Sequence, residues 1–83
     1  MKKKYEFTDE FILFGDEKLY RIRALKDFGS VRKGDLGGYI QDEKNLSHAG
    51  DAWVSGNAKV LDGAWVCDDA RVEDNALVVG SGV

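Results

Sequence analysis

The 83-residue sequence contains no proline, one cysteine and one histidine. A single cysteine excludes an internal disulfide framework, so Cys67 fits either a reducing cytoplasm or an accident of packing. The longest apolar run, Phe11–Phe14, is far shorter than the roughly 20 residues that a membrane-spanning helix needs. The balance of 12 basic against 15 acidic residues excludes a strongly basic surface for duplex nucleic acid. A chain of this length has room for one small core.

The second half of the chain repeats every six residues. One column of the repeat is valine, at Val54, Val60, Val66, Val72 and Val78. A second column is alanine, at Ala52, Ala58, Ala64, Ala70 and Ala76. Between them lie pairs of Gly, Asp and Asn, which tolerate left-handed backbone angles. A period of six fits neither an α-helix nor a hairpin ladder, and fixed self-similarity of this kind predicts a β-solenoid of short strands and corners.

This pattern resembles the hexapeptide repeat of left-handed parallel β-helices, in which three hexapeptides make one triangular coil. The preceding segments, Tyr20–Gly29, Lys33–Ile40 and Glu43–Ser47, are similar to the leader of short phage and prophage β-helix proteins, which are labelled polymer-forming or transferase-like. The resemblance implies an all-β fold, an N-terminal β-hairpin cap on a short left-handed parallel β-helix of about two coils. Residues 1–45 would form the cap and turn-rich leader and residues 46–83 the helix, in one continuous fold. It also implies a bacteriophage protein in the cytoplasm of a bacterial host.

The first half is expected to begin with the hairpin. Tyr5–Phe7 and Phe11–Phe14 would form its first strand, residues 15–18 a turn, and Leu19–Leu25 its second strand. Alternate residues of the second strand are expected to face the core: Tyr20, Ile22 and Ala24. The others are expected to face water: Leu19, Arg21 and Arg23. Ile40 and Leu46 are six residues apart and in register with Ala52, so we expect the first coil to begin near Leu36 to Leu46.

Residues 18 apart in such a helix lie above one another on the same face. The outward position before each valine would place Trp53 over Arg71, Lys59 over Leu77 and Trp65 over Val83. Trp53 and Arg71 would then form a cation–π pair. Two interpretations stay open, a ladder that stabilises the face or a platform for a planar anionic ligand or a partner protein. The residues predicted to bind that ligand or partner are Trp53, Arg71, Trp65 and Lys59.

No residue pattern points to catalysis, a metal or a cofactor. The aspartates fall on corner positions, where backbone geometry favours them: Asp62, Asp68, Asp69 and Asp74. His48 lies six residues before Val54 and is expected to point inward at the first coil as a partly buried residue. Cys67 has no histidine in predictable contact, and turn formation explains Gly34–Gly38 better than a phosphate loop does. We therefore expect a protein that is not an enzyme.

Two coils bury little apolar surface, and the last residues are apolar. We expect an uncapped C-terminal coil that forms a homo-oligomer, a dimer or trimer, through Leu77, Val78, Val79 and Val83; a monomer with a frayed end is the alternative. The leading hypothesis is a non-catalytic oligomeric binding protein, a phage-encoded counter-defence protein that sequesters a small nucleotide signal or blocks a host defence protein. The alternatives are a structural, polymer-forming phage protein and an acyltransferase-like enzyme fragment.

Overall fold

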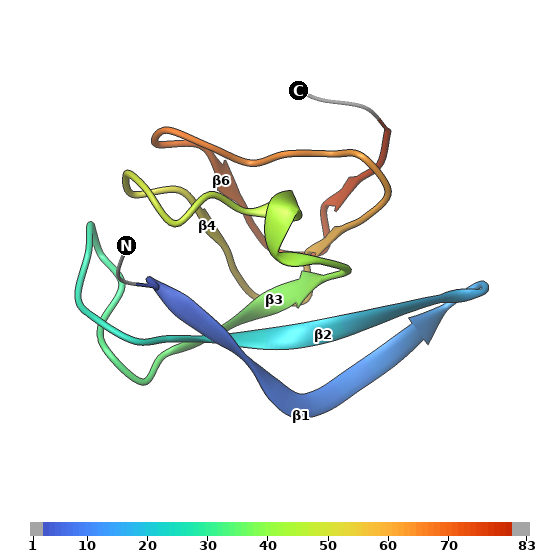
Figure 1. Cartoon of the computed structure of the whole chain (residues 1–83), viewed down its shortest axis with the longest axis horizontal. Helices are drawn as coiled ribbons and strands as arrows, with labels where there is room; N and C mark the ends of the chain where they lie inside the picture. Colours follow the sequence, from blue (N-terminus) through green and yellow to red (C-terminus); the bar gives the residue numbers. More distant parts are fainter. Residues whose placement is uncertain (1–2, 81–83) are drawn as a thin grey trace.

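A computed structural model describes residues 3–80 as an all-β chain. Strands β1 (Tyr5–Phe14) and β2 (Glu17–Ala24) form an antiparallel hairpin, which confirms the predicted one. Gly15 lies in the turn between them with φ of 63°, a value that costs glycine little. The hairpin is the long two-stranded ribbon in Figure 1, and the remaining strands are stacked on one side of it.

The strands of residues 3–80 form two sheets. The larger has the order β1-β2-β3-β5-β7, in which β3 (Leu36–Ile40) is antiparallel to β2, and β5 (Lys59–Val60) and β7 (Leu77–Val78) are parallel to their neighbours. The smaller contains β4 (Trp53–Val54) and β6 (Arg71–Val72), also parallel. A parallel bridge between Leu46 and Val66 makes a third set, after the 3-10 turn η1 (Glu43–Asn45). Parallel pairing therefore begins at β3, within the range Leu36 to Leu46 predicted for the start of the first coil, although this range overlaps the predicted leader of residues 1–45.

The spacing between parallel partners changes once along the chain. Val54 pairs with Val72 and Val60 with Val78, each 18 residues later, as predicted. Ile40 pairs with Val60 and Leu46 with Val66, each 20 residues later. Two extra residues therefore lie between Leu46 and Val54. The predicted register of Leu46 with Ala52 is wrong, because Leu46 occupies the valine column.

The corners keep a period of six from Gly50 onward. Their first residues all have positive φ: Gly50 72°, Gly56 63°, Asp62 60°, Asp68 59°, Asp74 59° and Gly80 113°. Aspartate is one of the few residues besides glycine that visit this left-handed region routinely. The prediction that the corner aspartates serve backbone geometry is confirmed for Asp62, Asp68 and Asp74, whereas Asp69 does not have a positive φ.

The core lies inside the stacked turns. Val54, Val60 and Val66 are buried, as are Ala52, Ala58 and Ala64. Ala70 and Ala76 continue the alanine column but are exposed. They belong to the last turn that the structure describes, and the turn before it covers only one of their sides.

The hairpin contributes to two apolar clusters, one on each side of the larger sheet. Ile22 and Ala24 join the main core, as predicted. Leu19 was expected to face water, and this is wrong, because it is fully buried. It packs on the opposite side of the sheet in a small cluster: Leu19, Tyr39 and Leu61, with Ile12 against them.

Gly37 and Gly38 lie within β3 rather than in a turn, which corrects the interpretation of Gly34–Gly38 as turn residues throughout. A Cβ atom on Gly37 would lie 2.6 Å from the carbonyl oxygen of Val54. On Gly38 it would lie 2.6 Å from the carbonyl oxygen of Ala58. These glycines let β3 approach the next turn of the chain closely. Only Gly34, with φ of 95°, serves a turn.

Candidate functional site

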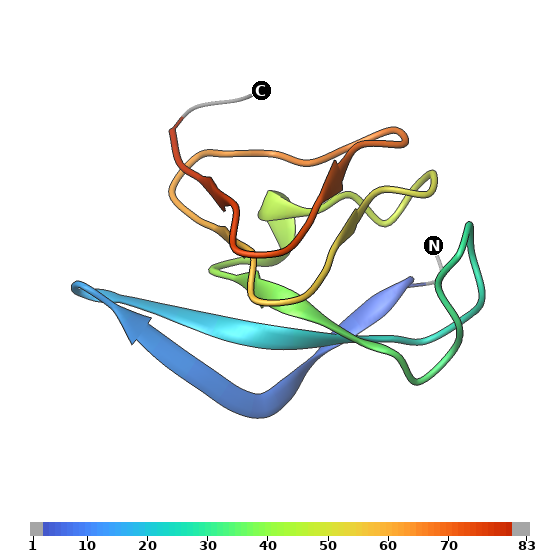
Figure 2. The same cartoon turned by 180° about the vertical axis from the view of Figure 1, so that it is seen from behind.

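The last described turn contains a cavity of about 590 Å³. It lies between the segment that leads into β6 and the end of β7. Figure 2 shows β6 and β7 on the side of the stack away from the hairpin. Three valines of the inward column line it, Val66, Val72 and Val78. The other lining residues are Trp65, Cys67, Asp68, Asp69, Ala70 and Arg71. The cavity therefore combines apolar side chains with an aromatic ring and three charged groups.

Two of the four predicted binding residues, Trp65 and Arg71, meet at this cavity. Trp65 is 51% exposed, as its outward position predicted. Arg71 is exposed too, but its Nη2 donates a hydrogen bond of 2.7 Å to Ser30 Oγ in the leader. The guanidinium is therefore held toward the leader, and Trp65 is the more available of the two.

Trp53 is not a surface residue, so its predicted role in a binding platform is wrong. It is 3% exposed, although it pairs in register with Arg71 as predicted. The leader covers it, with the Phe28 ring packed edge-on at 5.2 Å and the Tyr5 ring at 6.4 Å. Ser30 of the leader accepts a hydrogen bond from Arg71. The guanidinium of Arg71 therefore bonds to the leader instead of forming the expected cation–π pair with Trp53. Trp53 stabilises this side of the stack as a buried residue.

Lys59 and the predicted interface residues lie on other parts of the stack. Lys59 pairs with Leu77 as predicted, and its Nζ donates to the carbonyl of Asn57 at 3.1 Å. Lys59 does not line the cavity that the described residues form. Leu77 and Val79 are about half exposed, at 49% and 50%, and Val78 is half-buried against the core. Val83 lies outside the described residues.

The end of the chain that forms the cavity is acidic. Residues 61–80 contain one basic residue, Arg71, and five acidic ones, Asp62, Asp68, Asp69, Glu73 and Asp74. Desolvation and the neighbouring carboxylate of Asp68 raise the pKa of the Cys67 thiol. A thiol held in its protonated form is a weak nucleophile. Within residues 3–80, no group of three or more metal-ligating side chains is close enough to hold a metal ion.

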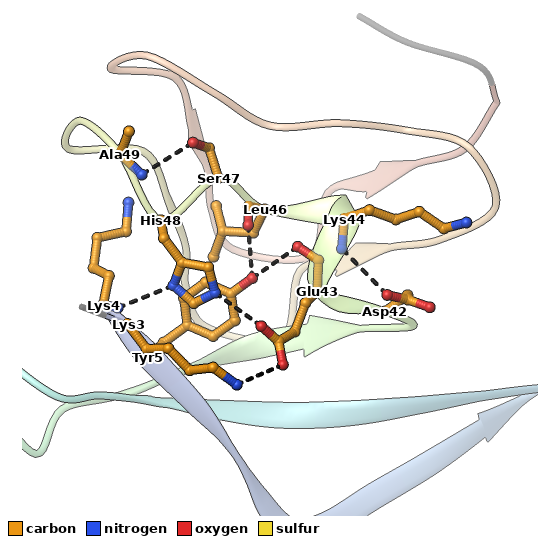
Figure 3. A network of polar contacts seen from close by, with 10 residues as sticks. All are labelled: Lys3, Lys4, Tyr5, Asp42, Glu43, Lys44, Leu46, Ser47, His48 and Ala49. Carbon is orange, nitrogen blue, oxygen red and sulfur yellow. Dashed lines mark hydrogen bonds and ion pairs between the residues drawn. The ribbon is translucent and has the colours of Figure 1, made fainter. Parts of the chain in front are cut away.

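His48, the single histidine, lies in a second polar group, the N-terminal network of Lys3, Lys4, Tyr5, Glu43 and His48 (Figure 3). Its Nδ1 accepts a hydrogen bond of 2.9 Å from the Lys4 backbone N–H. Its Nε2 must then carry the ring proton, and it lies 3.0 Å from Glu43 Oε1. The ring stacks on Tyr5 at 4.2 Å. His48 is half-buried as predicted, but the inward position belongs to Leu46, because the two extra residues shift the register.

The hydroxyl of Tyr5 holds the same segment from the other side. It lies 2.6 Å from the carbonyl oxygen of Leu46 and 3.0 Å from that of Glu43. Burial, followed by the nearby carboxylates of Glu43 and Asp42, raises the pKa of Tyr5. Hydrogen bonds from His48 and Lys3 lower the pKa of Glu43. The network ties the first strand to the extra residues of the first turn and leaves neither ring nitrogen of His48 free.

Sequence reasoning did not anticipate Lys4, which is fully buried within a run of three lysines. Its Nζ donates to the carbonyl oxygens of Ala52 at 2.7 Å and Gly50 at 3.2 Å, and it lies 4.7 Å from the centre of the Phe28 ring. Desolvation by burial lowers its pKa to about 8, although Asp51 acts in the opposite direction. Nothing in the charge pattern separates Lys4 from its neighbours, because its burial depends on carbonyls 46 and 48 residues away.

The structure thus brings together Trp65 and Arg71 at a cavity and places Trp53, Lys59 and His48 elsewhere. A scan against protein-family models gives no match, and a search of curated proteins gives none either. No helix among residues 3–80 is long and apolar enough to cross a membrane.

Proposed function

We propose that this chain is a non-catalytic binding protein that acts as an oligomer, and that the cavity beside Trp65 is its binding site. The observation that carries the proposal is the cavity itself. Its volume of about 590 Å³ lies in the range of ligand and partner pockets, and its lining is mainly apolar with a few charged groups. Exposed tryptophan at such a place is typical of an interaction hot spot.

We propose further that the stack is a short left-handed parallel β-helix of about two coils, with the hairpin as its cap. Offsets of 18 residues between parallel valines support this, as do corners with positive φ at every sixth residue. The left hand rests on the resemblance of the repeat to hexapeptide-repeat proteins. In the last described turn Leu77 and Val79 are exposed, and another chain can pack against such apolar side chains.

The environments of the two side chains best suited to catalysis favour a non-catalytic protein. Both ring nitrogens of His48 are engaged, one by the Lys4 backbone and one by Glu43, so neither is free to take a proton from a substrate. The raised pKa of Cys67 disfavours the thiolate form that a nucleophile needs.

The charges around the cavity favour a protein partner over a nucleotide. Trp65 offers a flat apolar surface, but Asp68 and Asp69 would face the phosphates of a nucleotide. Arg71 is the cationic residue of the lining, but its guanidinium is hydrogen-bonded to Ser30 rather than turned toward a phosphate position. The site therefore suits an apolar segment that carries a positive charge. A phage counter-defence protein that blocks a defence protein of the host remains a prediction. The apolar and acidic lining of the cavity is compatible with such a protein partner.

Sedimentation velocity from micromolar to millimolar concentration tests the proposal. Ala70 is exposed and lines the cavity, so Ala70→Arg places a long charged side chain at the cavity without replacing a buried residue. Ala76→Arg is the matched control, an exposed alanine of the same column that is not part of the lining. We expect the wild type and Ala76→Arg to associate alike and Ala70→Arg to associate at least tenfold more weakly. A wild-type chain that stays monomeric at millimolar concentration would contradict the proposal.

A further inference from the structure

Within residues 3–80, the large apolar side chains that are exposed lie toward two opposite ends of the molecule. Five lie on β1 or at the start of β3: Phe7, Phe11, Leu13, Phe14 and Leu36. Three lie in the last described turn: Trp65, Leu77 and Val79. Figures 1 and 2 show the hairpin at one end of the stack, with its tip projecting beyond the turns, and the last turn at the other end. One chain therefore presents two separate apolar surfaces.

The first surface is one face of the hairpin, formed by Phe7, Phe11, Leu13, Lys18 and Tyr20 and called the hairpin face below. Pairing places Phe11 opposite Tyr20 and Leu13 opposite Lys18, so these four share a side. Tyr20 stacks on Phe7 at 5.1 Å, and Lys18 Nζ lies 4.2 Å from the centre of the Phe11 ring. Leu13 is 71% exposed. The face is apolar and carries one positive charge.

The second surface is the cavity, whose properties match those of the hairpin face. Its base is apolar, with Val72 and Val78, and its lining includes the carboxylates of Asp68 and Asp69. We propose that the hairpin face of one copy occupies the cavity of the next, an inference that rests on the oligomer of the proposed function. Leu13 and Phe11 would enter the cavity, and Lys18 would lie near the two carboxylates. One contact then buries both apolar surfaces.

Contact between two cavities, the alternative that the C-terminal residues suggested, has two costs. It would bring the Asp68–Asp69 carboxylates of both copies together, where like charges repel. It would also leave the hairpin face exposed to water. The free edge of β1 is a poorer self-pairing site, because its register is interrupted between Phe7 and Phe11 by a segment that contains two acidic residues, Asp9 and Glu10.

A contact between unlike surfaces is heterologous, and its product differs from that of a symmetric dimer. Each copy added leaves one free hairpin face and one free cavity, so growth stops only if the copies close into a ring. The average mass of the wild type should therefore exceed that of a dimer as concentration rises.

Two variants separate the surfaces. Ala70→Arg places a long side chain at the cavity with a charge that repels Lys18, and Leu13→Asp places a carboxylate on the hairpin face. Ala76→Arg and Phe14→Asp are the matched controls, because Phe14 is exposed on the opposite side of the same strand. We expect each test variant to associate at least tenfold more weakly than the wild type in sedimentation velocity, since burial of one such side chain is worth roughly that factor. Both controls should behave as the wild type does.

An equimolar mixture of the two test variants gives the decisive result. Each retains the surface that the other has lost, so the mixture should form a complex of two chains and no larger species. If Leu13→Asp instead associates as the wild type does and Ala70→Arg does not, the cavities contact each other. That result overturns this inference and leaves the proposed function standing. A wild type that is monomeric throughout overturns both. Folding of every variant is checked by its thermal unfolding midpoint.

Discussion

Lys4 gives the sharpest test of the packing around the N-terminal network. Its ammonium is fully buried against the carbonyls of Gly50 and Ala52, and burial lowers its pKa from 10.5 to about 8. In the unfolded chain the same group titrates near the ordinary value. Between these two pH values the unfolded chain binds more protons than the folded one, so the free energy of unfolding rises with pH.

The two pKa values set the size of the effect. From about pH 7.5 to about pH 9.5, titration of Lys4 alone should raise the free energy of unfolding by about 2 kcal/mol. The pH window ends there because titration of Tyr5 lowers the free energy of unfolding at higher pH. The raised pKa of Tyr5 keeps its proton on the folded chain while the unfolded chain loses it. Stability from Tyr5 is therefore lost as the pH rises above the ordinary tyrosine value of about 10.

The assay is urea denaturation at several pH values within this window, for the parent and for Lys4→Met. Both proteins carry Cys67→Ser, so that the thiol does not titrate in the same range. Lys4→Met leaves two carbonyls without a donor, and we expect it to be the less stable protein at the upper end of the window. Its stability should change little with pH, whereas that of the parent should rise. Parallel pH profiles for the two proteins would refute the burial of a titrating Lys4.

Three other substitutions test local features by urea denaturation. Gly38→Ala should cost about 1–3 kcal/mol, because its Cβ would lie 2.6 Å from the carbonyl oxygen of Ala58; an unchanged midpoint would contradict this close approach. Asp68→Val should cost about 1 kcal/mol and Asp68→Gly should cost nothing, because φ is 59° there; equal effects would argue against the left-handed corner. His48→Phe should be more stable than His48→Ala by about 1 kcal/mol, since phenylalanine keeps the ring stack on Tyr5; an equal loss would assign the stabilisation to the ring nitrogens alone.

Features that depend on local geometry were predictable from the sequence. The hairpin follows from alternating side chains around Gly15, and the structure contains it. The corners follow from the six-residue phase of Gly and Asp, and each first corner residue from Gly50 onward has positive φ. The 18-residue offset between Val54 and Val72 follows from the same phase.

Features that depend on contacts between distant segments were not predictable. Ile40, Leu46 and Ala52 are spaced by six, so the sequence suggests an unbroken six-residue repeat from Ile40 onward. The two extra residues between Leu46 and Val54 could therefore not be detected from the spacing. The outward direction of Trp53 was predicted, but its burial requires Phe28, which the repeat does not include. In the candidate site the sequence identified Trp65 and Arg71. The bond from Arg71 to Ser30 reaches 41 residues back and has no local signal.

The stacking of one turn on the next underlies the cavity, its apolar base and both proposals, and nuclear Overhauser spectroscopy tests it most directly. In the structure the Ser55 backbone N–H donates to the Val72 carbonyl at 2.8 Å, within the parallel register of β4 and β6. This geometry places the Ser55 amide proton close to the α-proton of Glu73. We predict a strong cross-peak between these two protons. Its absence, with the Ser55 amide close to the α-proton of some other residue of the repeat instead, would contradict the stacked turns.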